Sequence, residues 1–232
     1  MPQFKKDNQD ERLFKIFSFY NSKVNPKVPD YQKAVFRHFG FSINHIVDES
    51  FTVHGDFLNY ICRNVTDTKY LIIFDIDCIP VKKDWFDKLM NDLRGPGTIA
   101  GAAQTANHLR DAKNLYVSPF FFGISTAYLK ELNYPDMHMT EDMDAGQNLT
   151  EHIIKNGGNV KYWWPTDIEE KKWTLYHPTH TEFGLGTTYN DSVYHAFLSL
   201  HNLSGRFIKK CKSLLPWYYF RLQWSNYKER KF

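Results

Sequence analysis

The sequence has few cysteines, and their spacing pairs none of them. Its three cysteines, Cys62, Cys78 and Cys211, are scattered and form no C-x-x-C motif. This pattern argues against a disulfide framework and a zinc site and favours reduced thiols. The N-terminus lacks the apolar stretch of a secretory signal, and the chain has no run of about 18 apolar residues, the length that spans a membrane. We therefore expect a cytoplasmic protein.

Excess charge is also scarce, but it is unevenly distributed. The net charge is +3 over 232 residues, yet residues 205–232 hold eight Lys and Arg residues against one acidic residue. Aromatic side chains lie between these cations, a composition that would suit a peripheral contact with a membrane surface. The alternative is a helix that packs on the domain with a solvated basic face. We expect no nucleic-acid partner, and we predict one main domain over 1–204 with a C-terminal tail or helix over 205–232.

Strand and helix patterns alternate through the first half of the chain. Short runs rich in β-branched and aromatic residues occupy 13–20, 42–50 and 69–77. Segments with apolar residues at helical spacing separate them, over 31–39 and 54–65. This alternation predicts an α/β fold with a central, mostly parallel sheet flanked by helices.

The second half of the chain is less regular. Its patterns predict helices over 85–93, 126–132 and 140–158, and extended segments over 98–104, 115–125 and 159–166. Residues 168–190 show no regular period, so we expect a loop with small turns there.

Polar side chains follow the predicted strands of the first half. Asn21 and Asp48 follow the first two, and the stretch YLIIFDIDCIP ends the third with Asp75 and Asp77. The carboxyl ends of parallel strands meet at one edge, where such sheets bind ligands. Two neighbouring carboxylates repel each other unless a cation lies between them, and their oxygens suit Mg²⁺ or Mn²⁺ held together with substrate phosphates. The alternative is a helix cap or a surface turn.

A second acidic cluster lies farther along the chain. Glu141, Asp142 and Asp144 open the helix predicted over 140–158. Acids are favourable at a helix N-terminus, but three acids in four residues exceed what capping requires. One of these carboxylates can therefore act as a general base.

The order of these motifs resembles a known enzyme family. FSFYNS, HIVDES, YLIIFDIDCIP, FFFGISTAYLKELN and TEDMDAGQNLTEHIIKNGGNVKYW follow one another as in nucleotide-sugar glycosyltransferases of the GT-A fold, especially family 2-like members. The resemblance implies a single Rossmann-like domain with a mixed, mostly parallel sheet. It also implies a nucleoside-diphosphate sugar donor, Mn²⁺ or Mg²⁺, and a glycan, lipid-linked or protein-linked acceptor.

The resemblance assigns roles to the residues at the strand ends. Asn21 and Asp48 would lie near the nucleoside of the donor. Asp75 would reach the ribose or the metal, and Asp77 would bind the metal directly. The segment HIVDESFTVHG lacks the second acid-Gly-Ser run that is common in the family, so the resemblance does not predict which base is recognised.

The resemblance also implies a third metal ligand and a base. A histidine near the end of the domain often binds the metal; VYHAFLSLHN offers His195 and His201, and we prefer His195. The alternative is a packing histidine, since His195 lies in an apolar run. Asp142 is the expected catalytic base, with Glu141 as the alternate, in a single inverting displacement.

Other functions remain open from the residues alone. A haloacid-dehalogenase-like phosphatase also carries a D-x-D motif after an apolar strand, with Asp75 as nucleophile and Asp77 as acid. A nucleotidyltransferase would need a glycine-rich phosphate loop near the first strand, which is absent. A non-catalytic carbohydrate-binding protein is the third alternative, and Trp163 and Trp164 are candidates for stacking on a sugar ring.

Overall fold

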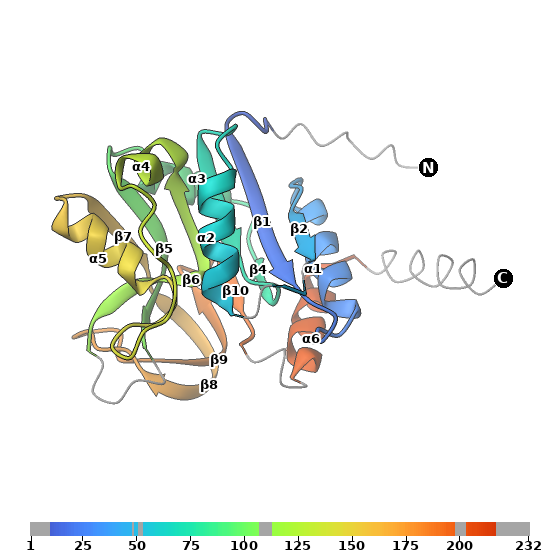
Figure 1. The fold of residues 1–232 in the computed structure, drawn as a ribbon. Coiled ribbons are helices and arrows are strands. Elements are labelled where there is room, and N and C mark those ends of the chain that lie inside the picture. The colour runs from blue at the N-terminus through green and yellow to red at the C-terminus, as the bar shows by residue number, and fades with distance from the viewer. Residues whose placement is uncertain (1–9, 48, 51–52, 107–112, 198–202, 217–232) are drawn as a thin grey trace.

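The protein folds into two β-sheets and six helices in the residues that the computed structural model describes, which are 10–47, 49–50, 53–106, 113–197 and 203–216 (Figure 1). In chain order the elements are β1 (Phe14–Tyr20), α1 (Lys27–His38), β2 (Asn44–Val47), α2 (His54–Asn64), β3 (Tyr70–Phe74), β4 (Cys78–Pro80), α3 (Trp85–Asp92), β5 (Thr98–Thr105), β6 (Leu115–Ser125), α4 (Thr126–Glu131), α5 (Gln147–Lys155), β7 (Asn159–Trp163), β8 (Pro165–Thr174), β9 (Glu182–Tyr189), β10 (Val193–His195) and α6 (Ser204–Leu214).

The larger sheet has six strands in the order β2-β1-β3-β6-β5-β7. β1 pairs in parallel with β2 and β3, and β5 pairs in parallel with β7. Only β6 runs against its neighbours β3 and β5. The predicted α/β fold with a mixed, mostly parallel sheet is therefore confirmed.

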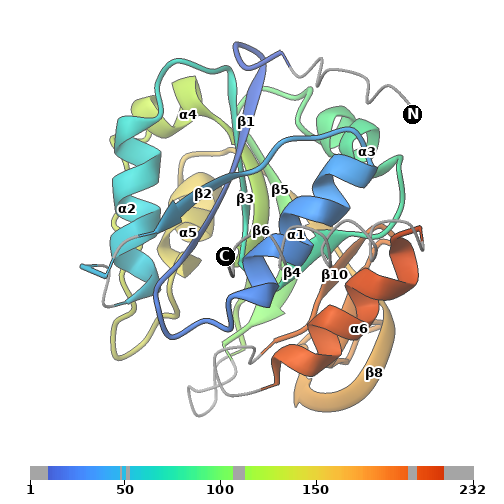
Figure 2. The ribbon, with the colours of Figure 1, turned by 90° about the vertical axis from the view of Figure 1, so that its right-hand side faces the viewer.

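Helices cover both faces of this sheet, so its central strand β3 is buried on both sides. Ile72 and Phe74 share one apolar cluster with side chains of α1 and α3. Leu71 and Ile73, which point the other way, share a second cluster with side chains of α2, α4 and α5. Figures 1 and 2 show α4 and α5 on one side of the sheet and α1 on the other. A strand that is buried on both faces reads as a continuous apolar run, which is why β3 is visible in the sequence.

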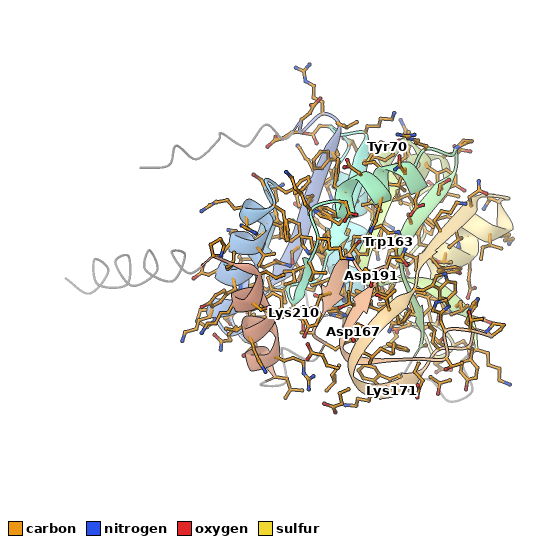
Figure 3. The ribbon with its side chains drawn as sticks, turned by 180° about the vertical axis from the view of Figure 1, so that it is seen from behind. Tyr70, Trp163, Asp167, Lys171, Asp191 and Lys210 are labelled. Atoms are coloured by element: carbon orange, nitrogen blue, oxygen red, sulfur yellow. The ribbon has the colours of Figure 1, made fainter. Side chains whose placement is uncertain are left out.

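The smaller sheet has four antiparallel strands in the order β4-β10-β9-β8. It contradicts the prediction of a loop over 168–190, because β8 and β9 form a long hairpin there. β8 is mostly exposed and carries charged residues on successive positions, so it lacks the alternation that marks a half-buried strand. Figure 3 shows Asp167 and Lys171 along this strand.

Two helix starts also differ from the predictions. α1 begins at Lys27, with Pro29 in its first turn, where a missing backbone N–H breaks no helical hydrogen bond. α5 begins at Gln147, directly after Gly146, whose φ is 76°. The acids of 141–144 therefore precede this helix and do not form its first turn.

The described part of the C-terminal segment is a helix that packs on the domain. α6 contacts α1 and buries Phe207 and Cys211. Arg206 donates from two guanidinium nitrogens to Glu169 and Glu170, each at 2.8 Å. The predicted division at residue 204 stays a prediction, and the aromatic and basic residues from 217 onward lie outside the described residues. In the described ranges, the chain has no helix with the length and apolar character needed to cross a membrane.

Candidate active site

The D-x-D motif lies in a turn that joins the two sheets. Asp75 directly follows β3, and its N–H donates to Phe120 O at 2.7 Å in the larger sheet. Cys78 N–H donates to Asp75 O at 3.0 Å and closes the turn. On the side of the smaller sheet, Ala196 N–H donates to Asp77 O, also at 3.0 Å. The backbone that carries both carboxylates is thus fixed from two directions.

The structure brings the three predicted metal ligands together. One ligand atom from each of Asp75, Asp77 and His195 lies within 4.8 Å of the others. His195 Nε2 is 2.9 Å from Asp77 Oδ1 and 3.7 Å from Asp75 Oδ2. β10 pairs with β4 so that His195 faces Cys78, which explains how a residue 118 positions from Asp77 reaches it.

These residues fit a divalent cation. Two carboxylates and an imidazole are a donor set that Mn²⁺ accepts. Asp77 and His195 are each 4% exposed, whereas the Asp75 side chain is 25% exposed, so the cluster is open to solvent on one side. His195 Nδ1 is buried and has no hydrogen-bond partner among the described residues. The His195 ring packs on Phe120 and Phe197, with ring-centroid distances of 4.1 and 3.9 Å, and Nε2 is the ring nitrogen that faces the two carboxylates.

The acidic segment before α5 is held less tightly. Glu141 and Asp142 are exposed. Thr140 Oγ1 accepts hydrogen bonds from the backbone N–H of Asp142 at 3.3 Å and of Met143 at 3.1 Å. Two acids of this segment, the predicted base Asp142 and its alternate Glu141, therefore lie in a surface turn.

Asp144 is anchored to the sheet, in contrast to its two neighbours. The Tyr116 hydroxyl donates to Asp144 Oδ2 at 2.5 Å. Burial raises the pKa of Tyr116 well above its ordinary value, and the charge of Asp144 acts in the same direction, so the hydroxyl stays protonated. The sequence pattern included Asp144 in the acidic cluster but gave it no role, and Tyr116 was hidden in an apolar run.

An irregularity in β6 contributes contacts to the D-x-D turn, and the same strand also anchors Asp144. Gly101 pairs with Phe122, but Ala103 pairs with Val117, so β6 has extra residues that bulge out of the ladder. Within this bulge Phe120 stacks on His195 and accepts the hydrogen bond from Asp75. Bulges often re-aim side chains next to functional sites. Because Tyr116 lies near the start of the same strand, β6 links the cluster of Asp75, Asp77 and His195 with the acidic segment at one edge of the sheet.

The predicted nucleoside contacts are only partly described. Asn21 is half-buried after β1, and its Oδ1 accepts a hydrogen bond from Lys23 N–H at 3.1 Å. Asp48 lies outside the described residues. Its neighbour Glu49, which the sequence did not single out, accepts hydrogen bonds from Ser22 N–H at 2.7 Å and Ser22 Oγ at 3.2 Å. Glu49 therefore ties the ends of β1 and β2 together.

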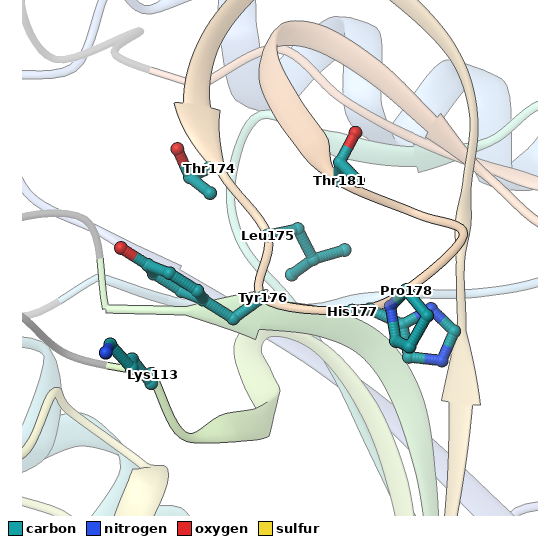
Figure 4. A pocket seen from close by; sticks show the side chains of 7 residues that line it. All are labelled: Lys113, Thr174, Leu175, Tyr176, His177, Pro178 and Thr181. Atoms are coloured by element: carbon teal, nitrogen blue, oxygen red, sulfur yellow. The ribbon is translucent and has the colours of Figure 1, made fainter.

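A shallow pocket of about 480 Å³ lies at the β8–β9 loop (Figure 4). Its lining includes none of the predicted site residues and consists of Lys113, Thr174, Leu175, Tyr176, His177, Pro178 and Thr181. Tyr176 N–H donates to Thr105 Oγ1 at 3.3 Å, which joins this loop to the end of β5. Trp164 is half-buried and packs on His177 at 4.1 Å, whereas Trp163 is buried and donates to Asp92. Of the two tryptophans, Trp164 is thus the one near a pocket.

Comparison with known proteins relates the fold, but not the sequence, to characterised enzymes. No family model matches the sequence, and no curated protein matches it. The chain is similar to the catalytic domain of β-1,4-galactosyltransferase 7 from Drosophila, in complex with xylobiose, at 13% identity and a TM-score of 0.48, covering 82% of this chain and 73% of that one. It is also similar to the mannosyltransferase PcManGT from Pyrobaculum calidifontis, in complex with GDP-Man and Mn²⁺, at 10% identity and a TM-score of 0.47, covering 65% and 54%.

A synthetase of another class is among the similar structures. It is CMP:2-keto-3-deoxy-manno-octonic acid synthetase complexed with CTP, at 10% identity and a TM-score of 0.40, covering 65% of this chain and 89% of that one. The predicted GT-A resemblance is matched by glycosyltransferases among the similar structures. At these identities and scores, no activity is carried over from them to this chain.

Proposed function

We propose that the protein transfers a sugar from a nucleoside-diphosphate sugar to an acceptor hydroxyl, with Mn²⁺ or Mg²⁺ as cofactor. The observation that carries the proposal is the convergence of Asp75, Asp77 and His195 from two sheets at one edge of the fold. Asp144, two residues after Asp142, is attached to the same edge through Tyr116. A cation cluster beside an accessible carboxylate is what metal-assisted glycosyl transfer needs.

The residues would divide the reaction between them. A cation bound by Asp75, Asp77 and His195 would neutralise negative charge on the diphosphate of the donor. Asn21 and Asp48 would lie near the nucleoside. Asp142, or Glu141 as the alternate, would take the proton of the acceptor hydroxyl.

The displacement needs only the donor, the acceptor and the base. The acceptor oxygen forms a bond to the anomeric carbon as the bond from that carbon to the phosphate oxygen breaks. The electron pair of the broken bond leaves with the nucleoside diphosphate, and the proton remains on the base. A single displacement of this kind inverts the anomeric configuration.

The acceptor in this proposal is a glycan, free or linked to lipid or protein. Trp164, a predicted sugar-stacking residue, lies beside the pocket, and its ring packs on His177 and His180. A cytoplasmic location and a contact of the basic tail with a membrane surface belong to the same proposal.

Binding and turnover assays with a panel of donors test this function. We expect Mn²⁺ and UDP or GDP together to raise the melting temperature more than either alone, because a ligand that binds only the folded state stabilises it. We also expect release of the nucleoside diphosphate from at least one sugar nucleotide. Phosphate release from an aryl phosphate, lost in Asp75→Asn, would instead indicate the phosphatase. Binding of the nucleotide without turnover of any donor would indicate a non-catalytic protein.

A further inference from the structure

Gln32 is a polar side chain in the apolar face of α1. It is 0% exposed, like Val28, Val35 and Phe36 on the same face of the helix. A buried amide costs free energy unless its donors and acceptor are paired. Its partners therefore show why a glutamine is suited to this position.

Both polar atoms of the Gln32 side chain are paired, and its amide nitrogen holds the D-x-D turn. Gln32 Nε2 donates to Asp75 O at 2.7 Å and to Cys78 O at 2.8 Å. These two carbonyls flank Asp77 along the chain. The reverse orientation of the amide would place its oxygen against two carbonyl oxygens, so the nitrogen must face the turn.

His45 fixes the other end of the same amide. His45 Nε2 lies 2.7 Å from Gln32 Oε1, and since that oxygen can only accept, the ring carries its hydrogen on Nε2. Burial, with a smaller contribution from Lys33, lowers the pKa of His45 to about 3, so the ring is neutral at physiological pH. Its ring meets Tyr20 edge-on at 5.4 Å, at the end of β1 beside the predicted nucleoside contact Asn21.

We propose that Gln32 is a positioning residue that holds Asp75 and Asp77 ready for one cation. This inference rests on the proposed function, because it assigns the carboxylates to a metal. The two side chains repel each other when no cation is bound. Gln32 binds the carbonyl groups of Asp75 and Cys78 from the side of α1 and so opposes any relaxation of the turn. Its hydrogen bond with His45 helps to hold the amide in this orientation. Residues that orient metal ligands typically change metal affinity by about 10–100-fold when they are replaced.

Binding of Mn²⁺ alone to the full chain tests this role, followed by the loss of the electron paramagnetic resonance signal of free Mn²⁺. In Gln32→Met, which keeps the length of the side chain and removes its hydrogen bonds, we expect the Kd for Mn²⁺ to rise about 10–100-fold. Thr126→Val is the matched control. Thr126 Oγ1 donates to Thr68 O at 2.6 Å near the opposite end of β3, so this variant loses the same kind of bond away from the cation. It should lower the melting temperature and leave the Kd unchanged.

The possible results distinguish a failure of the proposed function from a failure of the role assigned to Gln32. A wild-type protein that does not bind Mn²⁺ would overturn the proposed function and the role of Gln32 with it. Binding by the wild type with an equal Kd in folded Gln32→Met would overturn the role of Gln32 alone. If Gln32→Met does not fold, His45→Phe serves instead, because it leaves Gln32 in place but removes the hydrogen bond that Gln32 Oε1 accepts and so holds the side chain less firmly. A Kd raised several-fold in His45→Phe supports the proposal, and an unchanged Kd contradicts it.

Discussion

The two acidic groups of the candidate site differ in how firmly the protein holds them. Asp77 and its partner His195 are each 4% exposed, and the turn around them is bonded to both sheets and to α1. Glu141 and Asp142 are exposed in a surface turn, and Asp144 beside them accepts a hydrogen bond from the Tyr116 hydroxyl.

This difference matches two different chemical tasks. A metal site works best when its ligands are placed before the ion arrives, since each ligand that must be ordered on binding weakens the affinity. A general base must reach an incoming acceptor and exchange its proton, which favours an accessible position. In the proposed function, the fixed corner formed by Asp75, Asp77 and His195 would therefore hold the cation and the donor, and the open segment 141–144 would meet the acceptor.

The largest expected effect comes from removing a carboxylate from the fixed corner. Asp77→Asn should abolish Mn²⁺-dependent binding of UDP or GDP and lower transfer by about 10³-fold, or ~4 kcal/mol, because it removes a buried negative charge from the cation. Isothermal titration and a donor-release assay measure both effects. Asp67→Asn is the control, because the Asp67 side chain is 68% exposed and pairs with Lys15 before β3. Unchanged Mn²⁺-dependent binding in Asp77→Asn would refute the metal assignment.

A second prediction concerns the open segment. Asp142→Asn should keep donor binding but lower transfer by about 10²–10⁴-fold, the usual contribution of a general base. Asp144→Asn should cost much less, since we expect Asp144 to anchor the segment through Tyr116 without taking the proton. Separate measurements of donor Kd and transfer rate distinguish binding from chemistry. The opposite order of the two variants would assign the base to Asp144.

The strands and helices that pack on both faces of the larger sheet could be predicted from the sequence. β1 and α2 carry periodic patterns because one face of each packs on the core, and β3 is a continuous apolar run because both of its faces do. The hairpin of β8 and β9 could not be predicted, since β8 carries charges on exposed positions and is defined by its pairing with β9. Strand pairing of this kind follows from tertiary structure and leaves little local signal.

The charged residues of the candidate site could be predicted from the sequence, whereas the residues that tertiary packing brings to it could not. Asp75 and Asp77 interrupt an apolar run, and a strand buried in the core has no need of two carboxylates there. The proximity of His195 depends on the register between β4 and β10, so the sequence suggested it only through the resemblance. Gln32 left a signal that was not used, as a polar residue on the apolar face of α1. A buried amide at such a position indicates backbone groups in need of a partner.

The smallest expected effect concerns His138, which attaches the chain just before the open segment to α2. His138 Nε2 lies 2.9 Å from Asp56 Oδ1 on α2, and Nδ1 lies 2.6 Å from Asp136 Oδ1. The hydrogen bond to Asp56, followed by that to Asp136, raises the pKa of His138. A raised pKa in the folded state means that the charged ring stabilises the fold below its unfolded value of about 6.5, and that this stabilisation is lost as the pH rises through the folded pKa.

His138→Gln should therefore lower the melting temperature at pH 5.5 and have little effect at pH 9. We expect a difference of roughly 0.2–1 kcal/mol, because the His138 side chain is 41% exposed and exposed pairs contribute little. His152→Gln on α5 is the control, since the described contact of its ring is to a backbone oxygen, that of Asn148, and not to a carboxylate. A difference that is constant with pH, or grows as the pH rises, would contradict the assignment. If the difference follows the predicted course, the chain just before the open segment is attached to α2 by a contact that weakens toward alkaline pH.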